Sequence, residues 1–287
     1  MGIAKGGTIM YDVIVIGGGP AGLSAAVQLR KRGRSVLVVS NPARQNPLWR
    51  AERIDNYLGL PGKTGAELLE AFQQHASDMG AEFKTGRVLS AMAFEGWMVN
   101  VGAEVYEARA LILAPGVNRG AKYPGEQELL GSGVSYCATC DGMLYRGKAV
   151  TVVGRSADAP QEANYLAQMG CQVTYVSPQA PQGLQEGIPY VKAHKLAVKG
   201  TQRVDALEAD GALLPCEGVF ILRESVAPTD LIPGLALEEG YVQVNRRMET
   251  NVPGVFAAGD CTGKPLQLAK AVGDGLMAAD SADGYLG

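Results

Sequence analysis

The chain has 287 residues, of which 47% are hydrophobic and 19% charged, and this length is sufficient for two globular domains. A net charge of −3 and an aromatic content of 6% argue against nucleic-acid binding and base stacking. The five cysteines are an odd number, no secretory signal opens the chain and no apolar run reaches the ~18 residues of a membrane span, so we expect a cytoplasmic protein.

The first nucleotide-type unit follows a Gly-rich tail, residues 1–9, that shows no pattern. Residues 12–16 predict an apolar strand, residues 23–32 a helix and residues 35–39 a second strand. Between the first strand and the helix, Gly17, Gly19 and Gly22 occupy the G-x-G-x-x-G positions. Because these glycines permit a tight turn and a close approach of backbone N–H groups to a pyrophosphate, the unit is predicted to bind a dinucleotide.

The next part of the chain lacks one feature of that motif. The acidic residue that usually follows about 20 residues later is replaced by Ser40, whose hydroxyl can still bond to a ribose. Residues 41–60 predict a loop, residues 63–79 an amphipathic helix and residues 81–113 several strands.

Two cysteines, Cys137 and Cys140, form a C-x-x-C pair with Asp141 directly after it. Such a pair can close and reopen a small disulfide ring and so carry two electrons. The alternative is half of a zinc site, but the other Cys and His residues fall in no second paired motif. The spacing therefore favours a redox disulfide.

A second strand–turn–helix–strand unit follows the cysteines at residues 148–176, and residues 232–234 predict a linker leading back. Near the C-terminus, residues 252–260 predict a strand that ends in Gly259-Asp260, and a helix is predicted from Leu268 to Ala282. A carboxylate at the end of such a strand can hold a ribityl hydroxyl of a flavin.

With these segments in place, the chain resembles the low-molecular-weight thioredoxin reductases. The resemblance covers nearly everything after Tyr11 and is carried by residues 13–22, 54–57, 136–142 and 252–267 together with Gly273-Asp274-Gly275. It implies an α/β fold of two Rossmann-like three-layer domains. The FAD-binding domain would comprise residues 10–117 and 240–287, and an inserted redox-disulfide domain with a degenerate NADPH-type fold would comprise residues 118–239.

The resemblance also assigns roles to individual residues. Cys140 would face the flavin, Cys137 would attack the disulfide of thioredoxin, and Asp141 would shuttle the thiol proton. A homodimer is implied as well. The implied FAD contacts are Gly17, Gly19, Pro20, Ala21, Gly22, Ser40, Asn46, Asn56, Gly259, Asp260, Gln267 and Leu268.

One region departs from the NADPH-dependent members of that family. The loop carries Ser156 where the family has a second glycine, and residues 176–182 contain no base where the family places a His-Arg-Arg cluster for the 2′-phosphate. The pattern is similar to that of ferredoxin-dependent flavin thioredoxin reductases, so we expect ferredoxin as the electron donor. The alternatives are an NADPH-dependent thioredoxin reductase, an FAD-dependent dithiol oxidase that uses O₂, and a redox sensor without turnover.

Overall fold

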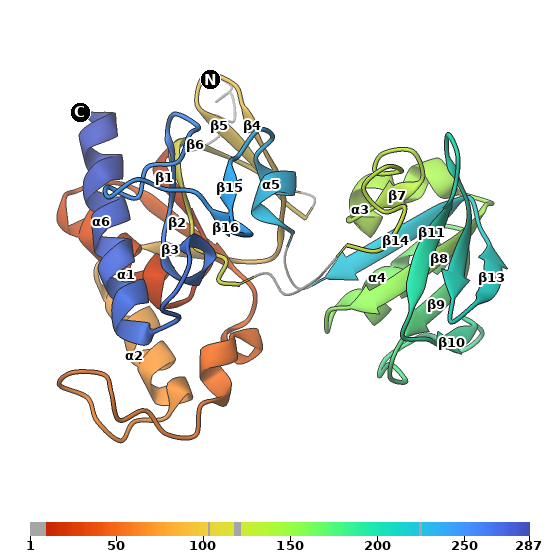
Figure 1. Cartoon of the computed structure of the whole chain (residues 1–287), viewed down its shortest axis with the longest axis horizontal. Helices are drawn as coiled ribbons and strands as arrows, with labels where there is room; N and C mark the ends of the chain where they lie inside the picture. The colour runs from red at the N-terminus through yellow and green to blue at the C-terminus, as the bar shows by residue number, and fades with distance from the viewer. Residues whose placement is uncertain (1–9, 103, 118–121, 224–225) are drawn as a thin grey trace, which may run out of the picture. The chain divides into compact units, whose positions relative to one another are not determined.

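The computed structural model describes residues 10–102, 104–117, 122–223 and 226–287, and the chain forms two compact units (Figure 1). Unit 1 comprises Met1–Asn118 and Ser225–Gly287, and unit 2 comprises Arg119–Glu224. The chain thus returns to unit 1 earlier than the boundary of 239/240 expected from the sequence. The linker predicted at residues 232–234 is wrong, because Leu231 and Ile232 are buried. The tail predicted at residues 1–9 lies outside the described residues.

The secondary structure of unit 1 is mixed. Its helices are α1 (Pro20–Lys31), α2 (Gly65–Asp78), α5 (Pro228–Leu231) and α6 (Leu268–Leu286), with 3-10 turns η1 (Ala43–Gln45), η2 (Pro47–Arg50) and η4 (Gly259–Thr262). Its strands are β1 (Met10–Ile16), β2 (Val36–Ser40), β3 (Glu82–Thr85), β4 (Val88–Ala93), β5 (Trp97–Val101), β6 (Glu104–Leu113), β15 (Leu237–Glu238), β16 (Tyr241–Val242) and β17 (Val255–Ala257). The two 3-10 turns at 43–50 fall in a segment that the sequence predicted only as a loop.

The main sheet of unit 1 runs in the order β3-β2-β1-β6-β5-β4, and β17 also pairs with β6. Along one edge of β6, the antiparallel β5 pairs with its first half and the parallel β17 with its second half. The carboxyl ends of β1, β2, β6 and β17 therefore meet at one edge of the sheet, which is where ligands bind in folds of this class.

Helices α1, α2 and α6 pack on the face of this sheet that presents Val13, Val15 and Ile112. Small residues let α1 and α6 pack closely against each other. A Cβ atom on Gly275 of α6 would lie 2.1 Å from the backbone oxygen of Ala21 in α1. Glycine at position 275 thus sets the distance between the two helices.

A matched pair of substitutions tests this packing. Gly275→Ala is expected to lower the free energy of unfolding of unit 1 by about 1–3 kcal/mol, because the new methyl group overpacks the helix interface. Gly273→Ala, two residues away with no atom within 4 Å of its Cβ position, is expected to raise it by up to about 1 kcal/mol through helix propensity. Urea denaturation followed by tryptophan fluorescence measures both, since the chain's 2 tryptophans, Trp49 and Trp97, lie in unit 1. Equal effects of the two substitutions would contradict the packing argument.

Unit 2 contains β7 (Val134–Ser135), α3 (Ala138–Asp141), η3 (Gly142–Tyr145), β8 (Ala149–Arg155), α4 (Ala159–Gln168), β9 (Gln172–Ser177), β10 (Tyr190–Lys192), β11 (Leu196–Gly200), β12 (Val204–Ala209), β13 (Ala212–Pro215) and β14 (Gly218–Arg223). A parallel sheet runs in the order β10-β9-β8-β14-β7, and β11, β12 and β13 form a separate antiparallel sheet. The β8–α4–β9 connection between parallel strands repeats the topology of β1–α1–β2. The α/β class with two Rossmann-like sheets is thus confirmed.

None of the helices among the described residues is both long enough and apolar enough to cross a membrane.

Candidate functional site: the redox turn and the nucleotide cradle

The C-x-x-C pair is a disulfide in the structure. Cys137 and Cys140 are joined, with their Cα atoms 5.4 Å apart. The short edge strand β7 ends at Ser135, and Cys137 then caps the single turn of α3, which carries Cys140 and Asp141. We call residues 137–141 the redox turn.

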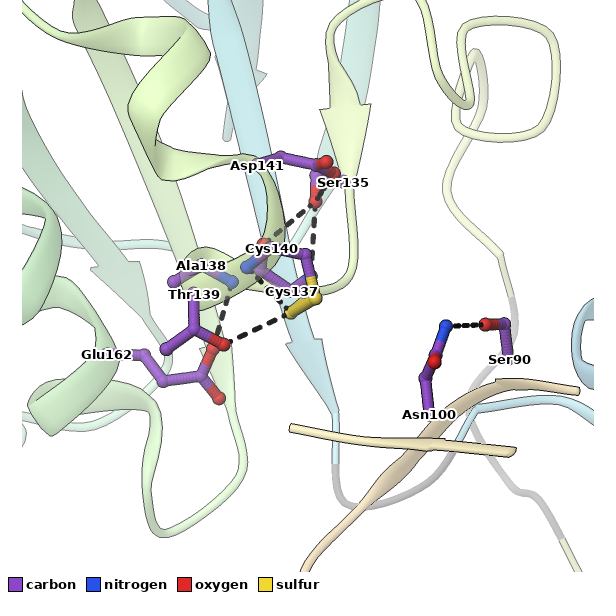
Figure 2. The surroundings of a disulfide bond; sticks show 9 residues. All are labelled: Ser90, Asn100, Ser135, Cys137, Ala138, Thr139, Cys140, Asp141 and Glu162. Atoms are coloured by element: carbon purple, nitrogen blue, oxygen red, sulfur yellow. Dashed lines mark hydrogen bonds between the residues drawn. A yellow bond between two sulfur atoms is a disulfide. The ribbon is translucent and has the colours of Figure 1, made fainter. Parts of the chain in front are cut away.

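Hydrogen bonds hold the redox turn on two sides (Figure 2). On one side, the hydroxyl of Ser135 lies 2.6 Å from Oδ2 of Asp141 and accepts from the backbone N–H of Cys137 at 3.1 Å. On the other side, Glu162 in the first turn of α4 accepts from the N–H of Ala138 at 3.1 Å. Within the turn, the N–H of Cys140 lies 3.1 Å from Sγ of Cys137.

The two cysteines differ in exposure. Cys137 is 6% exposed, whereas Cys140 lies on the surface and Asp141 is half-buried. Tyr145 lies in η3, directly after the turn. Its pKa is raised, mainly by burial and secondly by the negative charge of Asp141. The structure thus places a carboxylate, an exposed cysteine and a buried cysteine within five consecutive residues.

A buried ion pair, Glu126–Arg223, contacts Tyr136, the residue that precedes the redox turn. The fully buried carboxylate of Glu126 receives two hydrogen bonds from Arg223, of 2.6 and 2.7 Å, and one from the hydroxyl of Tyr136 at 2.9 Å. Burial alone would raise the pKa of Glu126, but the hydrogen bonds and charge of Arg223 outweigh burial and hold the pKa below its usual value. Because Tyr136 precedes Cys137, this pair anchors the chain immediately before the disulfide.

In unit 1, the turn between β1 and α1 forms a backbone cradle. Gly17 has φ +118°, and its Cβ atom would lie 2.1 Å from the oxygen of Ala114. A Cβ atom on Gly22 would lie 1.9 Å from the oxygen of Gly17. Only glycine fits at these two positions, and Pro20 and Ala21 then begin α1. This turn has the form that a dinucleotide pyrophosphate requires.

Polar residues from two other segments lie next to the same turn. A Cβ atom on Gly18 would lie 2.7 Å from the Ser40 hydroxyl at the end of β2, and one on Gly19 would lie 3.3 Å from Nδ2 of Asn46. Further along, Nδ2 of Asn56 donates to Oε1 of Gln267 at 3.0 Å, across 211 residues of sequence. The fold therefore brings predicted FAD contacts from both ends of the chain together.

The C-terminal segment completes this cradle. Gly259 has φ +85° and starts the 3-10 turn that carries Asp260, directly after β17. Lys270 and Asp274, one turn apart on α6, form an ion pair of 2.7 Å. Lys270 donates to the Gly259 carbonyl at 2.9 Å, and Asp274 accepts from the Gly259 N–H at 3.1 Å. This pair fixes the loop that carries Asp260, and Leu268 opens the helix beside it.

The corresponding turn in unit 2 differs. The hydroxyl of Tyr175 lies 1.8 Å from the Cβ position of Gly154, the first glycine of the loop. Ser156, at the second-glycine position, has a buried hydroxyl with no hydrogen-bond partner in the described part of the chain. At the end of β9, the hydroxyl of Ser177 bonds to the carbonyl of Gln179, and that of Tyr190 to the carbonyl of Ser177. Side chains of the unit itself therefore occupy this end of the sheet.

The three remaining cysteines, Cys171, Cys216 and Cys261, are free and buried. Burial raises the pKa of each thiol, and that of Cys261 reaches about 12. Over the described ranges, no three Cys, His, Asp or Glu side chains are grouped so as to hold a metal ion.

Several residues of these sites escaped the sequence analysis. Ser135 and Glu162 support the redox turn, and Glu126 pairs with Arg223 across 97 residues. A polar residue directly before the C-x-x-C motif is a weak signal, and an acidic residue in a helix's first turn has an ordinary dipole role. Nothing in the local sequence indicates that these side chains meet.

Comparisons with known proteins agree with this architecture. Residues 11–275 match the family described as pyridine nucleotide-disulphide oxidoreductase. The thioredoxin reductase of Bacillus subtilis is 34% identical over 96% of this chain and 95% of its own length. Two crystal structures of a ferredoxin-flavin thioredoxin reductase from Clostridium acetobutylicum are also similar. One has a TM-score of 0.89 at 38% identity, covering 97% of this chain and 98% of that one, and the other a TM-score of 0.87 at 42% identity, covering 96% and 98%. With a redox disulfide in one Rossmann-like unit and a dinucleotide cradle in the other, the chain belongs to the pyridine nucleotide-disulphide oxidoreductase family and is a homologue of thioredoxin reductases.

Proposed function

We propose that the chain is an FAD-dependent thioredoxin-disulfide reductase whose electron donor is reduced ferredoxin. The observation that carries the choice of donor is the base-free segment after β9. Residues 176–190 contain no Lys, Arg or His, and Ser177 and Tyr190 bond within this segment. Each missing charge-assisted contact to a nucleotide phosphate is worth about 1.5–3 kcal/mol, so the loss of two or three weakens NADPH binding by orders of magnitude.

Two further observations support the same choice. Tyr175 fills the space beside Gly154, where a pyrophosphate approaches the backbone in a dinucleotide-binding turn. The two similar structures with TM-scores of 0.89 and 0.87 are both described as ferredoxin-flavin thioredoxin reductases.

The cradle of unit 1 suits FAD. Gly17 and Gly22 leave room for a pyrophosphate, Asp260 offers a carboxylate to the ribityl chain, and Ser40 offers a hydroxyl to the ribose. When bound, FAD supplies a group that accepts single electrons and delivers them as a pair. Asn46, which lies near Gly19, the hydrogen-bonded Asn56 and Gln267, and Leu268 at the start of α6 are proposed as further contacts.

The overall reaction is favourable. Two reduced ferredoxins, two protons and one thioredoxin disulfide give two oxidised ferredoxins and one thioredoxin dithiol. The reduction potential of plant-type ferredoxins is about −400 mV, and that of thioredoxin is about −270 mV. For two electrons, this gap of about 130 mV corresponds to about 6 kcal/mol.

We assign residues of the redox turn separate steps in the disulfide exchange. When the ring is reduced, Cys137 attacks the thioredoxin disulfide, and one thioredoxin sulfur leaves as a thiolate. Cys140 then attacks the mixed disulfide, which releases the second thioredoxin sulfur and closes the Cys137–Cys140 ring. Asp141 holds or releases a proton beside Cys140, and the N–H of Cys140 stabilises negative charge on Cys137.

Removal of one carboxylate tests the cradle. Asp260→Ala is expected to weaken FAD binding by about 10- to 100-fold, because a charge-assisted hydrogen bond to the ribityl chain is lost. The measurement is the ratio of bound flavin to protein by absorbance, followed by titration of the apoprotein with FAD. Asp280→Ala, which removes an exposed carboxylate of the same unit paired with Arg32, is the control and should leave occupancy unchanged. Full occupancy in Asp260→Ala would remove this residue from the site.

The donor is tested by anaerobic stopped-flow mixing. We expect reduced ferredoxin to bleach the flavin absorbance rapidly and micromolar NADPH to bleach it slowly or not at all. Dithionite serves as the control that the flavin is reducible. Rapid bleaching by NADPH would refute ferredoxin dependence and favour the NADPH-dependent alternative.

Two other outcomes favour the remaining alternatives. Steady peroxide production from a small dithiol and O₂ indicates a dithiol oxidase, and a reduced pair that passes electrons to no thioredoxin indicates a sensor. The homodimer and the cytoplasmic location stay predictions.

A further inference from the structure

Ser135 is a buried polar residue of unit 2. It is 4% exposed and lies on β7, paired with Phe220 of β14. Burying a hydroxyl without hydrogen bonds is costly, so its partners indicate what it is for. Within the described part of the chain, the hydrogen bonds of its hydroxyl go to the redox turn, namely to Cys137 and Asp141.

The hydroxyl has one proton and two candidate acceptors. Oδ2 of Asp141 is 2.6 Å away and the carbonyl oxygen of Cys137 is 3.2 Å away. The shorter, charge-assisted contact takes the proton. The oxygen of the same hydroxyl accepts from the N–H of Cys137 at 3.1 Å. Ser135 therefore ties the first and the last residue of the redox turn together (Figure 2).

The Asp141 side chain has no other hydrogen-bond partner among the described residues, and it is half-buried. Without the hydroxyl, the carboxylate is free to rotate into solvent. Glu162 accepts from the backbone N–H of Ala138, on the other side of the turn.

We propose that Ser135 is a positioning residue that holds the Asp141 carboxylate beside the Cys137–Cys140 disulfide for proton transfer. This inference rests on the proposed role of Asp141 in the proposed function. It adds that the role depends on a hydroxyl six residues earlier in the chain.

The test uses dithiothreitol and the full-length protein, with neither ferredoxin nor thioredoxin. One dithiothreitol thiolate attacks the protein disulfide, and a protein sulfur leaves and takes a proton. The second dithiothreitol thiolate then closes a six-membered ring and releases the other protein sulfur, which is also protonated. The rate is followed by alkylating the new thiols and counting them by mass spectrometry.

The expected result is a non-additive double-mutant cycle. Asp141→Asn slows reduction by about 10²-fold, as expected for loss of a general acid. Ser135→Ala slows it by about 10-fold in the wild-type background, but by less than about 2-fold in the Asp141→Asn background. Ser135→Thr keeps the hydroxyl and restores the rate to within about 3-fold of wild type.

Thr151→Val is the matched control, because it removes another buried hydroxyl from the same sheet, away from the redox turn. It should reduce at the wild-type rate. If Ser135→Ala slows reduction equally in both backgrounds, or if Ser135→Thr fails to restore the rate, Ser135 acts through packing and the inference is overturned. An unchanged rate in Ser135→Ala overturns it as well. If the wild type does not reduce thioredoxin, the proposed function is contradicted. The double-mutant cycle with dithiothreitol still tests Ser135 in that case, because it uses no thioredoxin.

Discussion

Replacement of Cys137 or Cys140 by serine is expected to lower the rate of thioredoxin reduction by at least about 10³-fold, because neither single sulfur can carry two electrons as a disulfide. Cys140→Ser should leave the flavin reducible but unable to pass electrons on. The measurement is turnover with reduced ferredoxin and oxidised thioredoxin, with flavin absorbance recorded in parallel. Cys171→Ser, at a buried free cysteine, is the control and should keep turnover. Wild-type turnover in both single mutants would make the pair structural.

The same two variants separate the roles of the sulfurs. A thioredoxin that lacks its resolving cysteine is first activated at its remaining cysteine as a mixed disulfide with 5-thio-2-nitrobenzoate. Cys140→Ser should then attack through Cys137, release thionitrobenzoate and form a stable mixed disulfide with thioredoxin, and Cys137→Ser should not. The structure makes this a sharp test, since Cys137 is 6% exposed and Cys140 lies on the surface. Trapping through Cys140 instead would reverse the roles that the family resemblance assigns.

Loss of the buried carboxylate behind the redox turn is expected to have the largest effect on stability. Glu126→Ala should lower the free energy of unfolding of unit 2 by about 3–5 kcal/mol, because it leaves the guanidinium of Arg223, itself 14% exposed, without its carboxylate partner. Urea denaturation followed by circular dichroism measures the loss. Tryptophan fluorescence, which reports on unit 1, is the internal reference. Glu208→Ala removes the half-exposed partner of Lys199 in the same unit and should cost less than about 1 kcal/mol. A cost as small as that for Glu126→Ala would contradict the argument.

The same pair makes stability depend on pH in a definite direction. Burial opposes ionisation of Glu126, but Arg223 outweighs it and lowers the pKa of Glu126 in the folded state. The stabilisation is therefore fully present above the unfolded-state pKa of about 4.3, and it is lost as pH falls through the lower, folded-state pKa. Wild-type stability should fall more steeply below about pH 4 than that of Glu126→Gln. Identical slopes would show that this carboxylate is not the group that titrates.

Local sequence was sufficient to predict the strand and helix around the glycine motif and the disulfide of the C-x-x-C motif. The spacing of Gly17, Gly19 and Gly22 predicts a strand–turn–helix unit, since few other residues tolerate that turn, and the structure has β1 and α1 on either side of it. The C-x-x-C spacing likewise predicts the disulfide, because three residues of separation suffice to close the ring. Both features are formed by residues that are close together in the chain, so the sequence alone is enough to predict them.

Other features depended on residues that are far apart in the chain. The sequence placed the return to unit 1 near residue 240, whereas the structure places it at residue 225. No local pattern distinguishes the end of β14 from a turn within one domain. The contacts that decide it are the burial of Leu231 and Ile232 in unit 1.

The support of the two sites was also decided only by tertiary structure. Arg223 meets Glu126 across 97 residues, Gln267 meets Asn56 across 211, and Ser135 reaches Asp141 only because the redox turn folds back over the end of β7. A polar side chain shows its role only through its partner, and a partner distant in sequence is set by sheet order and helix packing. The sequence by itself therefore indicated the candidate reactive residues, because their motifs are local, and the tertiary structure determined which residues hold them in place.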